Sequence, residues 1–380
     1  MSAAPVRVLM LVDNLHEGVG GGERFVVGLA SQLALQRYDV TVCTTRQARG
    51  AALQTLLEGG VRHFSLDRRT RRDVLRFRRL ASELRAHPPQ VLHAHKFGSN
   101  VWGSLFGRLC RVPVVIAHEQ TWSYEGNPLR KLIDGRMIGR LSTAFVAVST
   151  ADAERMVALE GVPAEKVVMI PNAYIPSWRS PHPDWSLRAE LGLPEDSELV
   201  GTAAMLRPQK AQHVLVDAFA QLAPRRAGAH LVIAGEGECR EALEAQITRT
   251  GLEGRVHLLG HRDDTDAILA QLEVAALSSD YEGTPLFAFE CFARGAPLVA
   301  TEVGGLVDIV EDGVTGRLVP RRDPAALAEA LEALLRDPDQ RRALAAAAER
   351  QLDAFRMPQI AERFSDLYAR LLADARAGAR

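Results

Sequence analysis

The sequence predicts an α/β protein of two domains, each built on a parallel β-sheet wound with helices. Its 380 residues are enough for about two domains that each bury a core. In the first half, short apolar runs alternate with amphipathic ones, which is the pattern of strand and helix units on a parallel sheet. From Ser177 to Glu198 the chain is rich in proline and charge, so we expect the domain boundary and hinge near 172–198.

Composition narrows the class of protein. Hydrophobic residues make up 47% and charged residues 24% of the chain, as in an ordinary globular protein. A net charge of -1 gives no general affinity for nucleic acid. No stretch approaches the roughly 18 apolar residues of a membrane span, and the first apolar run lacks a cleavage pattern. We expect a cytoplasmic protein with reduced thiols, because no C-x-x-C pair occurs among Cys43, Cys110, Cys239 and Cys291.

The first domain is expected to start with a strand, a glycine-rich loop and a helix from Glu23. The loop HEGVGGGER would let a phosphate or sugar approach the backbone. As a dinucleotide fingerprint it is incomplete, because Glu23 stands where a third glycine belongs and no ribose-binding acid follows the second strand. Arg46 keeps an NADP-binding alternative open. The predicted strands are Val6–Val12, Val40–Thr44, Val91–Ala94, Val114–Ala117 and Ala144–Val148.

Residues 68–85 carry eight arginines against two acids. Apolar residues recur among them at near-helical spacing, which predicts a basic amphipathic helix; they are Val74, Leu75, Phe77, Leu80 and Leu84. Such a helix can contact anionic lipid, at about 1 kcal/mol for each basic residue near the surface. The competing interpretation is a solvated outer face of a helix that packs on the sheet.

Three histidines follow neighbouring strands. His93 and His95 end one strand and His118, with Glu119, follows the next, so all are expected at the sheet edge where ligands bind. A zinc site is not expected from the three histidines, because no fourth ligand is near them in the sequence. The loop QTWSYEGNP after Glu119 has aromatic and polar groups of the kind that line a pocket for a second, acceptor substrate.

In the second half, Lys210 lies just ahead of a predicted helix, where it can neutralise a diphosphate. A merely solvated lysine is the weaker interpretation, because a cation at a helix start opposes the helix dipole. Asp264 and Asp266 form a D-x-D pattern that holds a metal in some transferases. They also open a helix, where acids are favoured in any case.

The stretch from Ser278 to Gly305 shows the most chemistry. A strand is predicted at Val274–Leu277, followed by Glu282 in a turn. Thr284 and Pro285 are expected to start a helix, since threonine caps free amides and proline suits the first helical position.

That helix start predicts a binding place for a charged, hydroxylated ligand. The amides of Leu286 and Phe287 would face an anion such as a diphosphate. Glu290, nearly two turns in, can accept hydrogen bonds from ribose hydroxyls, and Glu282 can reach a second polyol. The alternative is an acid-capped helix whose glutamates are only solvated.

The pattern E-G-x-P-x-x-x-x-E-x-x-A-x-G-x-P-x-V-A-T-x-V-G-G in this stretch resembles the signature of retaining GT-B glycosyltransferases of family 4 (glycosyl transferases group 1). The matching positions are Glu282, Gly283, Pro285, Glu290, Ala293, Gly295, Pro297, Val299 and Gly304. The resemblance implies two Rossmann-like, doubly wound domains that face a cleft. They would comprise residues 1–175 on the acceptor side and 176–357 on the nucleotide-sugar side, with the amphipathic segment 358–380 packing back on the first domain.

The resemblance also implies an activity and a set of site residues. A sugar would pass from a nucleotide diphosphate sugar to a hydroxyl acceptor with retention, the acceptor being a glycan or a lipid-linked intermediate of cell-envelope or exopolysaccharide synthesis. His118 would lie beside the donor sugar, unless it is a structural histidine bonded to backbone, and Gly20 to Gly22 would face the donor phosphates and the acceptor. The implied catalytic residues are Lys210, Glu282, His118 and Arg207, and the implied donor-binding residues are Gly21, Gly22, Gly283, Thr284, Pro285, Leu286 and Glu290.

The chain departs from the family pattern at two positions. Met205 stands five residues before Lys210, where the family has an arginine, and Ala173 replaces the glycine of an I-P-N-G segment. Either Arg207 replaces that arginine in the group of cations that binds the phosphates (the phosphate clamp), from a different position, or the enzyme is a weaker catalyst.

No cofactor or metal is expected beyond the donor, and the inner face of the plasma membrane is a candidate location through residues 68–85. An NDP-sugar epimerase or hydrolase of the same fold, and a non-catalytic nucleotide-sugar-binding protein, remain as alternatives.

Overall fold

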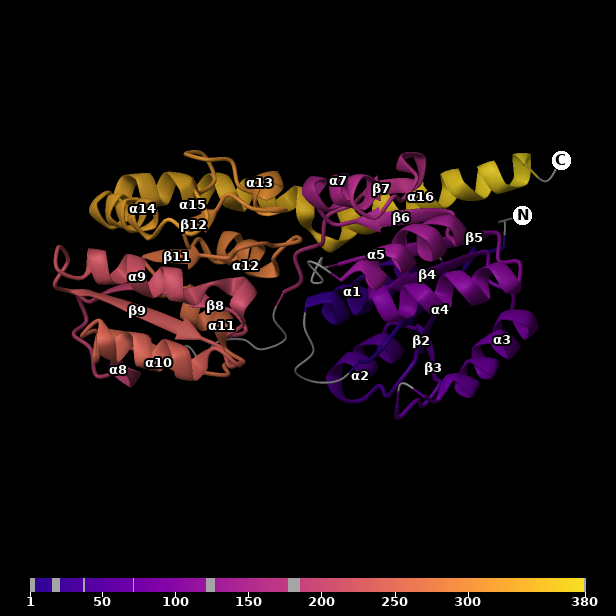
Figure 1. The fold of residues 1–380 in the computed structure, drawn as a ribbon, viewed down its shortest axis with the longest axis horizontal. Coiled ribbons are helices and arrows are strands. Elements are labelled where there is room, and N and C mark those ends of the chain that lie inside the picture. The colour runs from indigo at the N-terminus through magenta and orange to yellow at the C-terminus, as the bar shows by residue number, and fades with distance from the viewer. Residues whose placement is uncertain are drawn as a thin grey trace. The chain divides into compact units, whose positions relative to one another are not determined.

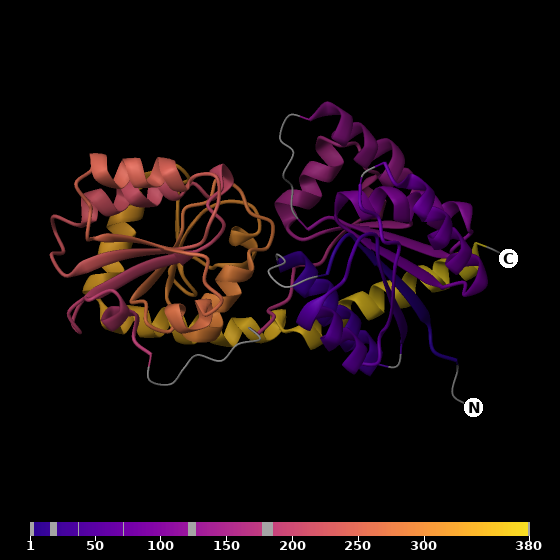
Figure 2. The ribbon, with the colours of Figure 1, turned by 90° about the horizontal axis from the view of Figure 1, so that it is seen from below.

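The computed structural model describes residues 4–15, 21–36, 38–70, 72–120, 127–176 and 185–378. The chain divides into two compact units, one of Met1–Ile175 with Phe355–Arg380 and one of Pro176–Ala354. Each unit is a parallel sheet with helices on both faces (Figures 1 and 2). The predicted α/β class with two doubly wound parallel sheets is therefore confirmed.

The sheet of the first unit has seven parallel strands in the order β3-β2-β1-β4-β5-β6-β7. The strands at its two edges, β3 and β7, were not predicted, because most of their residues are only half-buried and the runs are short. The five inner strands confirm the predicted ones within two residues at each end. The bounds are β1 (Arg7–Val12), β2 (Asp39–Thr44), β3 (Arg62–Ser65), β4 (Val91–His95), β5 (Val114–His118), β6 (Ala144–Ala147) and β7 (Val167–Met169).

Helices of the first unit include one from the far end of the chain. The C-terminal helix α16 contacts α1 and β5, and Tyr38 Oη lies 2.6 Å from Ser365 Oγ of α16. The helices are α1 (Gly21–Leu35), α2 (Gly50–Glu58), α3 (Phe77–Ala86), α4 (Lys96–Leu109), α5 (Pro128–Ile133), α6 (Gly139–Leu141), α7 (Thr150–Ala158) and α16 (Met357–Ala377), with short turns η1 (Val74–Arg76), η2 (Asp134–Ile138) and η3 (Ala164–Lys166).

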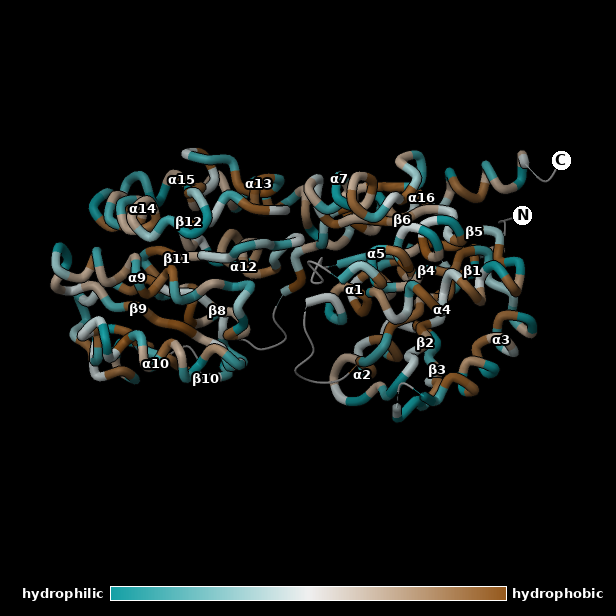
Figure 3. The backbone as a smooth tube through the Cα atoms, in the orientation of Figure 1, coloured by the Kyte–Doolittle hydropathy of each residue, from teal (hydrophilic) through white to brown (hydrophobic). Residues whose placement is uncertain are grey.

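The predicted basic helix over 68–85 is shorter than expected. Among the described residues of this segment only η1 and α3 are helical, and brown and teal segments alternate along α3 (Figure 3). Phe77, Leu80 and Leu84 are buried as predicted, whereas Val74 and Leu75 are 45% and 67% exposed because they precede the helix proper. The apolar stripe therefore splits into a buried part and an exposed part.

Two arginines of the same segment are engaged by the fold. The Arg68 guanidinium lies 4.7 Å from the centre of the Phe77 ring, and Arg79 Nη1 donates to the Ser65 carbonyl at 2.8 Å. These two side chains help to hold α3 on the sheet, so the whole set of arginines is not a solvated face.

The sheet of the second unit has six parallel strands in the order β10-β9-β8-β11-β12-β13. Two of its helices begin with an Asp-Pro pair, in which Asp323 accepts from the Ala326 amide and Asp337 from the Gln340 amide, both at 2.9 Å. The strands are β8 (Glu198–Ala203), β9 (Ala229–Ala234), β10 (Val256–Gly260), β11 (Val274–Leu277), β12 (Leu298–Thr301) and β13 (Arg317–Val319). The helices are α8 (Leu187–Glu190), α9 (Gln212–Leu222), α10 (Arg240–Arg249), α11 (Thr265–Leu269), α12 (Leu286–Arg294), α13 (Leu306–Ile309), α14 (Pro324–Arg336) and α15 (Pro338–Leu352), with turns η4 (Pro208–Lys210) and η5 (Asp353–Phe355).

Among the described residues, none of the helices combines the length and the apolar character needed to cross a bilayer.

Candidate active site

In the second unit, the strand order reverses between the neighbours β8 and β11. In open α/β sheets such a reversal leaves a crevice beyond the carboxyl ends of the two strands, which is the usual place for a ligand. The loop after β8 carries Lys210 and the loop after β11 carries Glu282. The fold therefore brings these two predicted residues, 72 positions apart, to one place.

Lys210 and Glu282 form an ion pair there. Lys210 Nζ lies 2.7 Å from Glu282 Oε1, and Ser279 Oγ donates to the same oxygen at 2.5 Å. The Glu282 side chain is 5% exposed, whereas that of Lys210 is 21% exposed. The Lys210 ammonium group is thus partly accessible to an anion, whereas the buried Glu282 carboxylate is held in place by Lys210 and Ser279.

Further hydrogen bonds tie the two loops together. The Asp280 amide donates to the Gln209 carbonyl at 2.8 Å, and Ser278 Oγ donates to the carbonyls of Lys210 and Ala211, each at 3.1 Å. Ala211 has a φ of 46°, which a non-glycine residue rarely adopts, and it forms the N-cap of α9. This strained turn aims Lys210 back toward the β11 loop.

A glycine allows a third segment to close on Glu282. Gly304 has a φ of +50°, and a Cβ atom there would overlap the Glu282 carbonyl oxygen. The Gly305 amide donates to the carbonyls of Glu282 and Gly283, at 3.2 and 2.9 Å. The close approach explains why glycine is needed at the end of the signature stretch.

The start of α12 differs slightly from the prediction. The helix begins at Leu286, so Pro285 is its N-cap instead of its first residue, and no side chain caps it. Thr284 lies one position earlier and is buried. The predicted cap was therefore wrong by one residue, but the amides of Leu286 and Phe287 do lie in the first turn. Glu290 is on the same helix and is 9% exposed.

The structure does not join Arg207 to this pair. Arg207 lines a separate cavity of about 140 Å³ together with Gln212 and Cys239, and Lys210 and Glu282 do not contribute to its wall. Met205, at the position of the family arginine, is 51% exposed. The described residues thus give the clamp one cation, Lys210, in contact with Glu282.

The two aspartates of the D-x-D pattern are each paired with an arginine. Asp264 Oδ2 lies 2.7 Å from Arg262 Nη2, and Asp266 Oδ2 lies 2.7 Å from Arg294 Nη2. Each carboxylate therefore has an arginine partner on one of its oxygens.

In the first unit, Gly21 and Gly22 are the first residues of α1. A Cβ at Gly22 would overlap Gln120 Oε1 and lie 2.6 Å from Lys96 Cε, so any larger residue there would require these two side chains to move. Gly20 and the rest of 16–20, like the predicted acceptor loop residues 121–126, lie outside the described residues.

An ion pair between Lys96 Nζ and Glu23 Oε1 lies beside Gly22. Lys96 has a φ of 67° and follows β4, next to β1, where the order of this sheet reverses. Sequence reasoning missed Lys96, and its only signal was its place directly after a strand.

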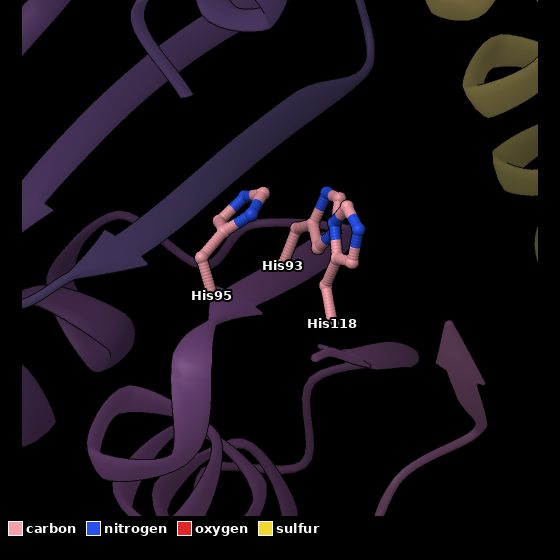
Figure 4. A group of neighbouring side chains, drawn as sticks. All are labelled: His93, His95 and His118. Atoms are coloured by element: carbon pink, nitrogen blue, oxygen red, sulfur yellow. The ribbon is translucent and has the colours of Figure 1, made fainter. Parts of the chain in front are cut away.

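His93, His95 and His118 lie together, and their rings approach one another (Figure 4). All three are fully buried, and burial lowers the pKa of each, that of His118 to about 3. Phe25 of α1 and Phe364 of α16 pack on His118, with ring centres 5.4 and 5.5 Å away. This burial favours the structural alternative for His118 over contact with a donor sugar.

The backbone of His118 is held by Asn100. The His118 amide donates to Asn100 Oδ1 at 3.1 Å, and Asn100 Nδ2 donates to the His118 carbonyl at 3.2 Å. The ring nitrogens of His118 form no hydrogen bond with any described residue. The ring is therefore not bonded to the backbone, as the structural alternative had assumed.

Comparisons with known proteins agree with this architecture. Residues 183–351 match the family described as Glycosyl transferases group 1, and residues 19–177 match that described as Glycosyltransferase Family 4. The chain is 30% identical over 293 residues to the alpha-D-kanosaminyltransferase of Streptomyces kanamyceticus, which covers 72% of this chain and 74% of that protein. It is 31% identical over 310 residues to the D-inositol 3-phosphate glycosyltransferase of Nocardia farcinica, which covers 76% and 68%.

Solved structures show the same fold. The Anabaena protein Alr3699/HepE in complex with UDP superposes with a TM-score of 0.80, at 23% identity, over 96% of this chain and 100% of that one. The sucrose-phosphate synthase of Thermosynechococcus elongatus gives a TM-score of 0.75, at 22% identity, over 97% and 100%. The chain therefore belongs to the group 1 glycosyltransferases and has the GT-B fold.

Proposed function

We propose that this glycosyltransferase uses a nucleotide diphosphate sugar and transfers the sugar to a hydroxyl acceptor with retention of configuration. The observation that carries the proposal is the Lys210–Glu282 pair beyond β8 and β11, with the partly exposed ammonium group beside a buried carboxylate. The HepE relative has been solved with UDP and with UDP-glucose, which supports a donor of this class for the present chain.

The chemistry follows from the charges. The bond from the anomeric carbon to the diphosphate breaks, and its electron pair goes to the diphosphate oxygen. The new bond forms to the acceptor oxygen on the same face, and the acceptor proton passes to the departing phosphate. Lys210 and the first amides of α12 stabilise the growing negative charge. Glu282 binds hydroxyls of the transferred sugar, and Glu290 binds the ribose.

Donor binding has a consequence for the ion pair. Glu282 Oε1 already accepts from Lys210 and Ser279, so a phosphate that approaches Lys210 takes a share of the ammonium group. The carboxylate is then left with capacity for sugar hydroxyls. The ion pair therefore keeps a buried carboxylate satisfied until the donor arrives.

We further propose that the exposed apolar pair Val74 and Leu75, flanked by arginines, holds the enzyme against an anionic membrane, where a lipid-linked glycan intermediate would be the acceptor. Both side chains are exposed although they are apolar; Arg76 follows Leu75 directly, and Arg72 precedes Val74 with Asp73 between them. Liposome co-sedimentation checks this: we expect binding to anionic vesicles that falls as salt rises and is weakened in Leu75→Ser. Salt-independent binding, or none, contradicts the proposal.

The experiment that tests the activity is a thermal-shift screen of UDP-, GDP- and ADP-sugars, followed by product analysis with the best binder. We expect one donor class to raise the melting temperature and the product to keep the anomeric configuration of the donor. Free sugar or an epimer formed without an acceptor identifies a hydrolase or epimerase instead. Ligand-stabilised melting without turnover identifies a binding protein.

A further inference from the structure

The histidine cluster of the first unit is the part of the molecule that the proposed chemistry leaves unexplained. His93 and His95 lie on one face of β4, with ring centres 4.1 Å apart, and His118 ends β5, with its ring centre 5.3 Å from that of His93. None of the three side chains is exposed. Buried polar groups in proteins nearly always have a hydrogen-bond partner, so a cluster without partners requires an explanation.

Five of the six ring nitrogens form no hydrogen bond with any described residue. They are Nε2 of His93 and both nitrogens of His95 and His118. A set of one nitrogen from each ring lies within 4.8 Å of one another. Three imidazoles that converge in this way, on two adjacent strands, provide the ligand type and number that zinc takes when a water molecule fills its fourth position.

The sixth nitrogen is engaged in a manner that suits a metal ligand. His93 Nδ1 lies 2.7 Å from Tyr368 Oη of α16, which is itself fully buried. Metal-binding histidines commonly donate their second ring N–H to an outer partner, which fixes the tautomer and leaves the other nitrogen free for the ion. If Nδ1 donates to Tyr368, the lone pair of His93 Nε2 faces the cluster.

We propose that His93, His95 and His118 bind one divalent transition-metal ion, with zinc as the natural occupant and water as the fourth ligand. Imidazole suits zinc, and neutral rings are the binding form. The nitrogens in a tetrahedral site are about 3.3 Å apart, given zinc-to-nitrogen distances near 2.0 Å. Side-chain rotations that draw the rings together are therefore part of binding.

The residues packed around the cluster would separate a bound ion from any substrate, so we infer a structural role for it. Phe25 of α1 and Phe364 of α16 cover the rings, so the ion would be enclosed as the C-terminal helix docks. Through Tyr368 the site links α16 to the sheet, although α16 lies far from β4 in the sequence. The strand pattern predicts no zinc because it provides no fourth protein ligand, and a water ligand removes that objection.

The test uses the untagged full-length protein grown with zinc. We expect about one zinc per chain by mass spectrometry, and tetrahedral visible absorption bands after exchange for cobalt. His118→Asn should lose both the zinc and the bands. The control with His230→Asn and His257→Asn, which removes the histidine pair of the second unit (Nδ1 to Nε2 3.2 Å), should keep them.

A second measurement does not depend on a variant that folds. A chelator should lower the melting temperature of the wild type, and added zinc should restore it. The proposal is overturned if folded wild-type protein holds only substoichiometric zinc, shows no cobalt bands and melts at the same temperature with and without chelator. A buried water molecule would then be the partner of the free nitrogens.

Discussion

Each sheet has a lysine–glutamate pair where its strand order reverses, but the two pairs are built differently. In the second unit, Glu282 holds Lys210 and is itself held by Ser279 and by the Gly304 loop. In the first unit, Lys96 holds Glu23 from a strained backbone position, and Glu23 Oε2 is buried without a hydrogen bond to any described residue. A fully braced pair favours one fixed ligand geometry. In the half-satisfied pair, one carboxylate oxygen of Glu23 can still accept a hydrogen bond from a ligand group such as a hydroxyl.

The largest effect is expected at Lys210, the residue of the Lys210–Glu282 pair that we propose binds the diphosphate. Lys210→Ala should lower kcat by about 100 to 1000-fold, or roughly 3 to 4 kcal/mol, as for the loss of one charge-stabilising donor. Steady-state kinetics with the preferred donor provide the measurement. Arg225→Ala is the matched control, because it breaks an ion pair with Glu332 (2.8 Å) elsewhere in the same unit. If the two variants lose equal activity, the clamp has no special role.

The bracing itself is tested at Gly304. Gly304→Ala introduces a Cβ that overlaps the Glu282 carbonyl oxygen at a φ of +50°, so we expect a stability loss of about 2 to 4 kcal/mol together with lower activity. Gly313→Ala is the control, because its φ of +76° costs the same backbone strain but nothing lies within 4 Å of the new atom. Urea unfolding of both variants separates the overlap from the strain, and equal losses would contradict the account.

A smaller effect is expected at the half-satisfied pair. Glu23→Gln should reduce kcat/KM for the acceptor by roughly 10 to 100-fold, the size of one charge-assisted hydrogen bond, and leave donor binding unchanged. Separate titration of donor and acceptor provides the measurement. A loss confined to donor affinity would place this pair on the other substrate.

The smallest effect concerns a buried acid in the first unit. Burial raises the pKa of Asp134 to about 7, although Arg130 opposes the shift. The unfolded carboxyl loses its proton near its ordinary pKa of 3.8, so the folded state holds more protons between there and pH 7 and its stability falls as pH rises.

Asp134→Asn should therefore stabilise the protein at pH 8 by about 1 to 2 kcal/mol and have little effect at pH 4. The gain is less than the full shift implies, because asparagine loses the contact of Arg130 Nε with Asp134 Oδ2 at 3.8 Å. Thermal unfolding at the two pH values measures it. Stabilisation that is equal at both would show that proton binding at Asp134 is not the cause.

Sequence pattern predicted the fold well because apolar runs report burial directly. The inner strands and the loop positions of Lys210 and Glu282 follow from it, whereas β3 (RHFS) is mostly polar and β7 is apolar but only three residues long. The pairing of Lys210 with Glu282 could not be predicted, since it depends on the strained turn at Ala211. Nor could the burial of His118, because the covering Phe364 and Tyr368 come from a helix at the far end of the chain. The sequence pattern predicts where the strands end. Side chains from distant segments determine which groups at those ends are accessible to a ligand.

A crystal structure with bound donor tests the central claim most directly. We predict diphosphate density within hydrogen-bonding distance of Lys210 Nζ and the first amides of α12, with sugar hydroxyls on Glu282 and ribose hydroxyls on Glu290. Donor density at another place, with the Lys210–Glu282 pair intact and unoccupied, would contradict the account.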